Sequence, residues 1–129
     1  ETQVVLGDSM GEMFAYYMAC DVAFIGGSLL PFGGQNLIEA CSVGKPVLIG
    51  THTYNFTEAS KLAVERGAAL RVEDANDLVQ KMQYLFRNRE RMIQMGRAGL
   101  EFVKANRGAT DIALSHISQD LALAEQVIP

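Results

Sequence analysis

Residues 21–40 read DVAFIGGSLLPFGGQNLIEA, and this stretch decides the fold class. Its first residues, 21–25, form an apolar run that does not alternate, which is typical of a strand covered on both faces. A loop with four glycines and one proline follows. A short helix is then predicted over 36–43, with Asn36 as its N-cap and Gly44 as its stop. A strand, a glycine-rich loop and a helix in this order indicate a βαβ unit of a parallel sheet.

The same alternation continues on both sides of this stretch. Short apolar or β-rich runs predict further strands over 3–7, 45–50 and 68–72. Helical periodicity predicts helices over 12–20, 57–66, 74–86, 89–104 and 110–127, with Thr57 as an N-cap, Gly67 at a C-cap position and Gly108 breaking the last two apart. The pattern predicts a Rossmann-like three-layer α/β/α domain with a parallel sheet over residues 1–129. Such sheets bind ligands at the carboxyl ends of their strands, so the strand-to-helix loops are the candidate sites.

The composition sets limits on the class of protein. With 129 residues, 49% of them hydrophobic, the chain is long enough for one domain with its own core. The net charge of −4 and the pI of about 5.1 argue against a nucleic-acid binder. No run approaches the roughly 18 apolar residues of a membrane span, and no signal peptide is visible. Cys20 and Cys41 lie in apolar stretches and are expected to be buried, reduced thiols. The chain begins without Met on a strand-like run, so we expect a domain of a longer protein.

The loop over residues 7–12 allows two compatible interpretations. Ser9 could cap the following helix, with Glu12 three residues later completing a capping box. The amides of residues 9–11 and the helix N-terminus could also line a pocket for an anionic or polar ligand.

The loop over residues 26–36 is the most informative feature of the chain. Gly33 and Gly34 precede the predicted helix, and their free amides at a positive helix end would suit a phosphate. Glu39 shares the first turn of that helix, where a carboxylate can accept two hydrogen bonds from a ribose diol. The alternative is a plain capping box between Asn36 and Glu39. The loop is neither a dinucleotide fingerprint nor a P-loop.

The loop over residues 50–57 mixes polar and aromatic side chains at the end of a strand. His52 could donate to a ligand oxygen, or it could be a loop histidine that is satisfied within the protein. Tyr54 and Phe56 are predicted to pack under the loop. No metal site is expected, because His52 and His116 are far apart and no paired cysteines or histidines have ligand spacing.

Five blocks of sequence, in this order, resemble the C-terminal half of bacterial transferases of 3-deoxy-D-manno-octulosonic acid (Kdo). They are GDSMGE (7–12), FIGGSL (24–29), GGQNLIE (33–39), GKPV (44–47) and HTYNF (52–56). The resemblance runs from residue 4 to about residue 120. It implies a glycosyltransferase of the GT-B type, in which two Rossmann-like halves face each other across a cleft. Residues 1–129 would be the C-terminal half, which binds the nucleotide sugar CMP-Kdo, and the N-terminal acceptor half would be absent from this chain.

The resemblance also implies roles for particular residues. Ser9, Met10, Gly11 and Glu12 would contact the nucleotide, Gly33, Gly34 and Asn36 would hold the phosphate, and Glu39 would bind the ribose hydroxyls. The remaining substrate-binding residues would be Gly27, Ser28, Gln35, His52 and Asn55. No catalytic residue is expected here, because the general base of the family is a glutamate of the N-terminal half. The reaction would need neither metal nor cofactor, with amides and a helix dipole stabilising the leaving CMP.

The implied partners follow from the family as well. The acceptor would be a lipid A precursor of lipopolysaccharide biosynthesis, bound with the membrane contact on the N-terminal half, at the cytoplasmic face of the bacterial inner membrane. No nucleic acid is expected. The chain on its own would bind CMP weakly and transfer no sugar. Its last helix either packs on this domain or crosses to the other half.

The sequence departs from the family at two points, and other functions stay open. The family usually has His-Asn-Pro where this chain has Gln35-Asn36-Leu37, so residue 35 can donate a hydrogen bond but carries no charge. The usual Pro-His-Thr-Phe-Asn-Phe is replaced by residues 51–56, THTYNF. One alternative is a GT-B glycosyltransferase or epimerase that uses a uridine nucleotide. Another is a non-catalytic or receiver-like module, although Asp8 and Lys45 lack the paired acidic cluster of a receiver.

Overall fold

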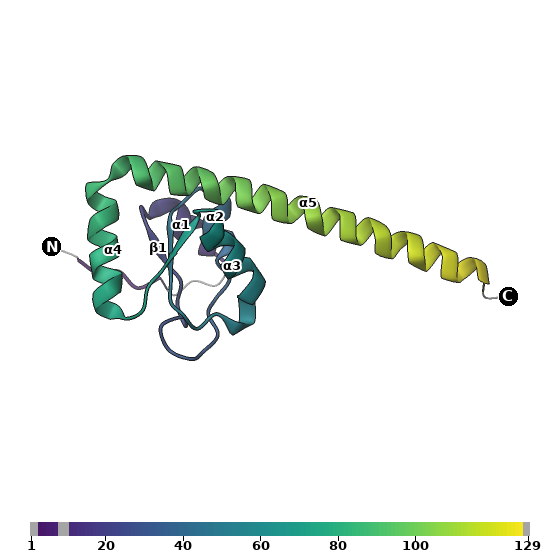
Figure 1. The fold of residues 1–129 in the computed structure, drawn as a ribbon, viewed down its shortest axis with the longest axis horizontal. Coiled ribbons are helices and arrows are strands. Elements are labelled where there is room, and N and C mark those ends of the chain that lie inside the picture. Colours follow the sequence, from purple (N-terminus) through teal and green to yellow (C-terminus); the bar gives the residue numbers. More distant parts are fainter. Residues whose placement is uncertain (1–2, 8–10, 128–129) are drawn as a thin grey trace.

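The computed structural model describes the backbone of residues 3–7 and 11–127, and the side chains of this part except those of 108–117 and 120–127. Three short strands, β1 (Ala23–Phe24), β2 (Val47–Ile49) and β3 (Ala69–Arg71), form a parallel sheet in the order β1-β2-β3. The helices, shown in Figure 1, are α1 (Met13–Ala19), α2 (Ile38–Ser42), the 3-10 turn η1 (Tyr54–Phe56), α3 (Thr57–Glu65), α4 (Ala75–Arg87) and α5 (Arg89–Val127).

Helices cover both faces of the sheet. Val47 and Ile49 of β2 are buried with residues of α2, α3 and the middle of α5. Leu48, between them, is buried with Leu85 of α4 and Met95 of α5. Because successive side chains of a strand point to opposite faces, these two clusters lie on opposite sides of the sheet. The predicted parallel α/β/α architecture is confirmed, and in Figure 1 the strands lie between α4 and the pair α2 and α3.

The strand predicted over residues 3–7 does not form. This segment is extended but belongs to no strand, and Val4, Val5 and Leu6 are 86%, 83% and 85% exposed. A β-rich run becomes a strand only when a neighbouring strand takes up its backbone hydrogen bonds. Within the described part of the chain, residues 3–7 have no such neighbour.

The break predicted at Gly108 is also absent, because α5 runs unbroken for 39 residues. One glycine inside a helix costs only about 1 kcal/mol relative to alanine, which a long helix tolerates. Figure 1 shows that the first part of α5 lies along the domain and that its C-terminal part extends beyond the other elements.

Three predicted helix ends can be compared with the structure. Gly44 and Gly67 have φ values of +73° and +80° and follow α2 and α3 as predicted. Thr57, predicted as an N-cap, is instead the first residue of α3. The 3-10 turn η1 leads directly into α3. The Thr57 hydroxyl donates to the carbonyl of Tyr54 at 3.3 Å.

A seam of small residues holds α5 against α2. A Cβ atom at Gly99 would lie 3.4 Å from the Cα of Cys41, and one at Gly44 would lie 3.3 Å from Leu100. Glycine at these positions lets the two backbones approach closely. Both cysteines are free thiols, as predicted, with Cys41 buried and Cys20 half-buried.

Candidate functional site

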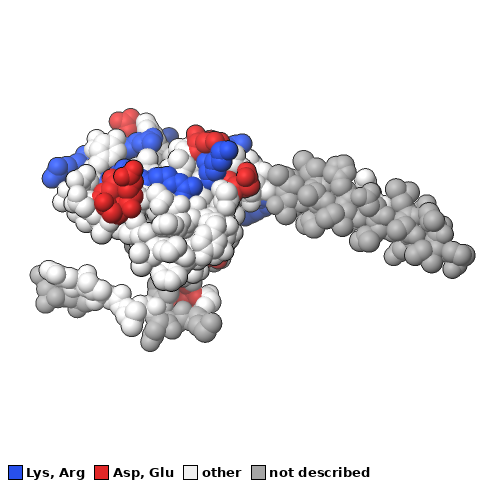
Figure 2. All heavy atoms as spheres, turned by 60° about the horizontal axis from the view of Figure 1, so that its bottom comes forward, with Lys and Arg blue, Asp and Glu red and all other residues white. Residues whose placement is uncertain are grey.

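The candidate site lies at one edge of the sheet. Because the strands are parallel, β1, β2 and β3 all end at this edge, at Phe24, Ile49 and Arg71. Residues 25–37, here called the glycine loop, lead from β1 to α2, and residues 50–56, the histidine loop, lead from β2 to α3. Neither loop contains Lys, Arg, Asp or Glu. Figure 2 brings this side of Figure 1 forward and shows a wide area without charged side chains on the domain body.

The glycine loop folds back on itself. The amide of Gly34 donates to the carbonyl of Gly27 and the amide of Gln35 donates to the carbonyl of Gly26, both at 3.0 Å. Gly27, Gly33 and Gly34 have φ values of +73°, +89° and +78°. Glycine adopts this left-handed region without strain, which explains why the loop is rich in glycine.

The histidine loop is bonded to the glycine loop along its length. Five hydrogen bonds join the two loops. Two reach Ser28, from Gly50 N to its Oγ (2.9 Å) and from His52 N to its carbonyl (2.9 Å). The others run from Asn55 N to Gly33 O (3.1 Å), from Asn55 Nδ2 to Phe32 O (3.3 Å) and from Tyr54 Oη to Pro31 O (3.0 Å). The two loops therefore form one unit. Phe56 packs against the core as predicted. The prediction for Tyr54 is wrong, because this residue is 63% exposed and its hydroxyl donates to the carbonyl of Pro31.

Ser28 has a structural position rather than the ligand contact expected for it. Its side chain is fully buried, and its Oγ donates to the carbonyl of Ile25 at 2.5 Å. The same oxygen accepts from the amide of Gly50 at 2.9 Å. The hydroxyl thus links the ends of β1 and β2, and it is not open to a ligand.

The free amides expected at Gly33 and Gly34 are only partly available. The Gly34 amide is used to close the glycine loop, because its donor points back to Gly27. The amides of Gly33, Asn36 and Leu37 make no hydrogen bond with another described residue, and of these three residues only Asn36 is not buried. The N-cap residue of α2 is Leu37 rather than the predicted Asn36, but Asn36 Oδ1 still accepts from the amide of Ile38 at 2.9 Å and leaves its Nδ2 as a donor.

Glu39 has a free carboxylate. The capping box predicted between Asn36 and Glu39 does not form, because Leu37 is the N-cap residue and the Glu39 side chain makes no hydrogen bond with a described residue. The carboxylate lies near Tyr17 of α1, whose pKa is raised, first by burial and second by the negative charge of Glu39. A half-buried carboxylate without a partner is free to accept hydrogen bonds from a ligand.

The loop over residues 7–12, before α1, shows fewer of the expected features. Ser9 and Met10 lie outside the described residues. Gly11 has a φ of +80°, and Glu12 is exposed and makes no side-chain cap on α1. No hydrogen bond joins Gly11 or Glu12 to the glycine or histidine loop. Gln35 is exposed and His52 is half-exposed, and neither side chain has a hydrogen-bond partner in the described part.

Sequence reasoning missed Arg71 and Thr53. The Nη1 of Arg71 donates to the carbonyl of Gly50 at 2.8 Å and to the Oγ1 of Thr53 at 2.9 Å. Burial lowers the pKa of this guanidinium. A charged residue at the end of the apolar run 68–72 was the available signal, since such a residue at a sheet edge usually has a polar partner.

The two loops form an open surface rather than a closed pocket. A cavity of about 370 Å³ lies at the opposite end of the sheet, next to Lys45 and Arg89. The described residues contain no group of acidic, histidine or cysteine side chains that could hold a metal ion. Among the described helices, none has the length and apolar character needed to span a bilayer.

A parallel α/β domain with glycine-rich loops at the carboxyl ends of its strands is the architecture of a nucleotide-binding half of a GT-B glycosyltransferase. The family model described as glycosyl transferases group 1 matches residues 1–102. The chain belongs to this family.

Individual relatives and a solved structure are similar to this chain. The chain is 47% identical over 107 residues to a 3-deoxy-D-manno-octulosonic acid transferase of Bordetella pertussis and 41% identical over 109 residues to one of Haemophilus influenzae. These matches cover 83% and 84% of this chain but 25% and 26% of the relatives, so the chain spans about a quarter of their length. The crystal structure of the C-terminal CMP-Kdo binding domain of WaaA from Acinetobacter baumannii superposes with a TM-score of 0.75 and 31% identity. That match covers 79% of this chain and 53% of the solved one.

Proposed function

We propose that this chain is the donor-binding part of a Kdo transferase and that it binds the nucleotide of CMP-Kdo at the glycine and histidine loops. The main support for the proposal is the likeness to the C-terminal domain of WaaA, which is named as a CMP-Kdo binding domain. The relatives named as Kdo transferases support the same donor. The uncharged loops, with the unbonded amide of Asn36 near the Glu39 carboxylate, suit a nucleotide monophosphate.

The roles of individual residues follow from the donors and acceptors left free. The phosphate would be held by the amide of Asn36 and by Asn36 Nδ2, since the Gly34 amide is engaged and Leu37 is fully buried. Glu39 would accept hydrogen bonds from the ribose hydroxyls. Gln35 and His52 would donate to the sugar or its carboxylate. The glycines would let the ligand approach the backbone closely.

The chemistry assigned to this chain is support for the leaving group. Breaking the bond between Kdo and CMP places negative charge on the phosphate, and amides fixed in advance stabilise that charge without reorganising. No metal and no cofactor is required for this role. The base that activates the acceptor would belong to the acceptor half, so the chain alone would bind CMP and transfer no Kdo.

The function of the whole protein is part of the same proposal. It would move Kdo from CMP-Kdo to a lipid A precursor in lipopolysaccharide biosynthesis, at the cytoplasmic face of the inner membrane. The acceptor half would hold the lipid and contact the membrane. A uridine-dependent glycosyltransferase or an epimerase is the other reading that the breadth of the group 1 family allows.

Titration of the ¹⁵N-labelled chain with CMP, UMP and inorganic phosphate tests the proposal. We expect CMP to move the amide signals of residues 33–39 and 52–55 and to bind more tightly than UMP. The cavity beside Lys45 and Arg89 is an internal control, because its signals should stay in place. Signals that move only at that cavity would overturn the assignment of the site.

A further inference from the structure

Arg71 connects the end of β3 to the histidine loop. Its Nη1 donates to two acceptors, Gly50 O at 2.8 Å and Thr53 Oγ1 at 2.9 Å. The first acceptor is the residue that follows β2, and the second lies in the middle of the loop. One nitrogen therefore holds both the start and the middle of the histidine loop.

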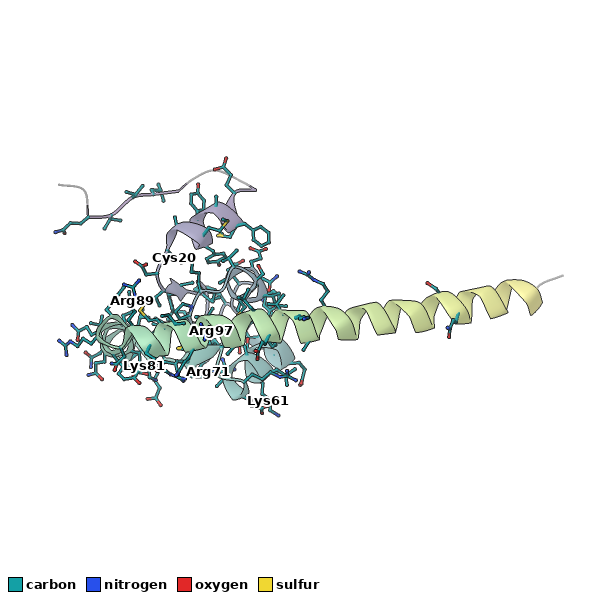
Figure 3. All side chains as sticks on the ribbon, turned by 90° about the horizontal axis from the view of Figure 1, so that it is seen from above. Cys20, Lys61, Arg71, Lys81, Arg89 and Arg97 are labelled. Carbon is teal, nitrogen blue, oxygen red and sulfur yellow. The ribbon has the colours of Figure 1, made fainter. Side chains whose placement is uncertain are left out.

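The backbone of Arg71 is itself held from α4. Lys81 Nζ donates to the carbonyl of Arg71 and pairs with Asp77 Oδ2 at 3.0 Å. Asp77 Oδ2 also accepts from the amide of Glu73 at 2.9 Å, and Asp74 caps α4 by accepting from the amide of Asp77 at 2.7 Å. Figure 3 shows Arg71 and Lys81 on the same side of α5. These hydrogen bonds fix the position of the Arg71 backbone, from which its side chain reaches the histidine loop.

The bonds made by Arg71 lead on to the glycine loop. Thr53 is 7% exposed, and its carbonyl accepts from the amide of Phe56 at 2.9 Å. Its neighbours His52 and Asn55 donate their amides to the glycine loop, and Asn55 reaches Gly33. A displacement of Thr53 would therefore be transmitted to the loop that carries the candidate phosphate site.

An arginine suits this position for two reasons. The planar guanidinium presents several N–H donors in fixed directions, so it can hold two acceptors at once. The glycine and histidine loops contain no Lys or Arg, and Arg71 is a cation that contacts the histidine loop from the adjacent strand. A lysine would keep the charge but not the fixed directions of the donors.

We infer that Arg71 is a positioning residue of the nucleotide site, which holds the histidine loop, and through it the glycine loop, in the geometry that binds the donor. Its contacts with Gly50 and Thr53 carry this inference, and its effect on the ligand rests on the proposed function.

The test uses the whole 129-residue chain as wild type, Arg71→Met, Arg71→Lys and Thr53→Val, with Arg97→Met on the exposed face of α5 as the matched control. Amide spectra are recorded first without ligand. We expect Arg71→Met to move the signals of Thr53, Asn55 and Gly33, and Arg97→Met to leave them in place. Loop signals in Arg71→Met that match the wild type would overturn the inference, whatever the ligand turns out to be.

The same proteins are then titrated with CMP. We expect Arg71→Met to raise the Kd about tenfold, as for loss of a charged hydrogen bond. Arg71→Lys should restore part of the affinity, and Arg97→Met should bind as the wild type does. Thr53→Val should weaken binding by no more than Arg71→Met, because it removes one of the two contacts of Arg71. If the wild type binds CMP and Arg71→Met binds it equally well, the inference is wrong and the proposed function stands. If the wild type binds no CMP, the proposed function fails, and the ligand-free spectra alone decide the role of Arg71.

A loss of folding would be seen by circular dichroism. Should Arg71→Met unfold, Thr53→Val and Arg71→Lys carry the test, because each removes or alters one contact and keeps the charge. Wild-type CMP affinity and wild-type loop signals in both of these variants would then overturn the inference.

Discussion

The amide of Asn55 donates to the carbonyl of Gly33 at 3.1 Å, and this bond joins the histidine loop to the glycine loop. A Cβ atom at Gly33 would lie 2.7 Å from the side-chain Cγ of Asn55. The contact leaves no room for any side chain at residue 33, so the geometry of the candidate site depends on this glycine.

Gly33→Ala is therefore expected to destabilise the chain and to separate the two loops. The φ of +89° is strained for alanine, and the added methyl also meets Asn55 and Tyr54. We expect a loss of about 2–3 kcal/mol in the free energy of unfolding, measured by urea denaturation.

Two other glycines separate the causes of that loss. Gly67 has a similar φ of +80°, and a Cβ atom there would meet no atom within 4 Å. Gly67→Ala should therefore lose only the free energy of backbone strain, about 1–2 kcal/mol. Gly26→Ala has neither strain nor a clash and should be nearly neutral. A Gly33→Ala protein as stable as Gly26→Ala would contradict the close contact with Asn55.

Ser28→Ala should lower the stability of the chain, because it leaves the buried amide of Gly50 without an acceptor. The substitution removes the acceptor of the Gly50 amide, which is fully enclosed, and a buried donor without a partner costs about 1–3 kcal/mol. Thermal denaturation measures the loss. Ser42→Ala is the control, because its hydroxyl only donates to the Glu39 carbonyl within α2. Equal melting temperatures for the two variants would argue against the buried link between β1 and β2.

Glu39→Gln should weaken binding of CMP and leave the fold intact. The Glu39 carboxylate has no hydrogen-bond partner among the described residues, so its removal breaks no contact of the protein. We expect about tenfold weaker binding of CMP by calorimetry and little change for 2′-deoxy-CMP, which lacks one of the hydroxyls. Glu58→Gln, on the exposed start of α3, should bind as the wild type does. Equal losses for both nucleotides would place Glu39 away from the ribose.

The stability of the chain should fall at high pH because of Cys41. Burial raises the pKa of this thiol from 9.0 to about 11, so the unfolded chain loses the proton at a lower pH than the folded one. The stabilisation is complete below pH 9 and is lost as the pH rises toward 11, by about 3 kcal/mol in all. Urea denaturation between pH 8 and pH 10.5 measures the slope, and Cys41→Ala should show a shallower one. Identical slopes would contradict the buried thiol.

The sequence was sufficient for the parts of the fold that depend on neighbouring residues. Glycine at residues 44 and 67 ends two helices as predicted, and the apolar runs around Ala23, Val47 and Ala69 form the parallel strands. These features follow from local backbone preferences and periodicity.

The sequence predictions that failed depend on contacts between residues far apart in the chain. Residues 3–7 have the composition of a strand, but a strand requires a partner that the described residues do not supply. The Gly34 amide is not free, because loop closure brings the Gly27 carbonyl to it. Arg71 was missed because its partners, Gly50 and Thr53, become neighbours only when β3 lies beside β2.

The central claim is that this chain binds a cytidine nucleotide at the glycine and histidine loops. Calorimetric titration of the whole chain with CMP and with UMP under the same conditions tests it most directly. The account predicts a lower Kd for CMP than for UMP, and it predicts that Glu39→Gln removes most of this binding. A chain that binds UMP as tightly as CMP, or CMP with no dependence on Glu39, would contradict it.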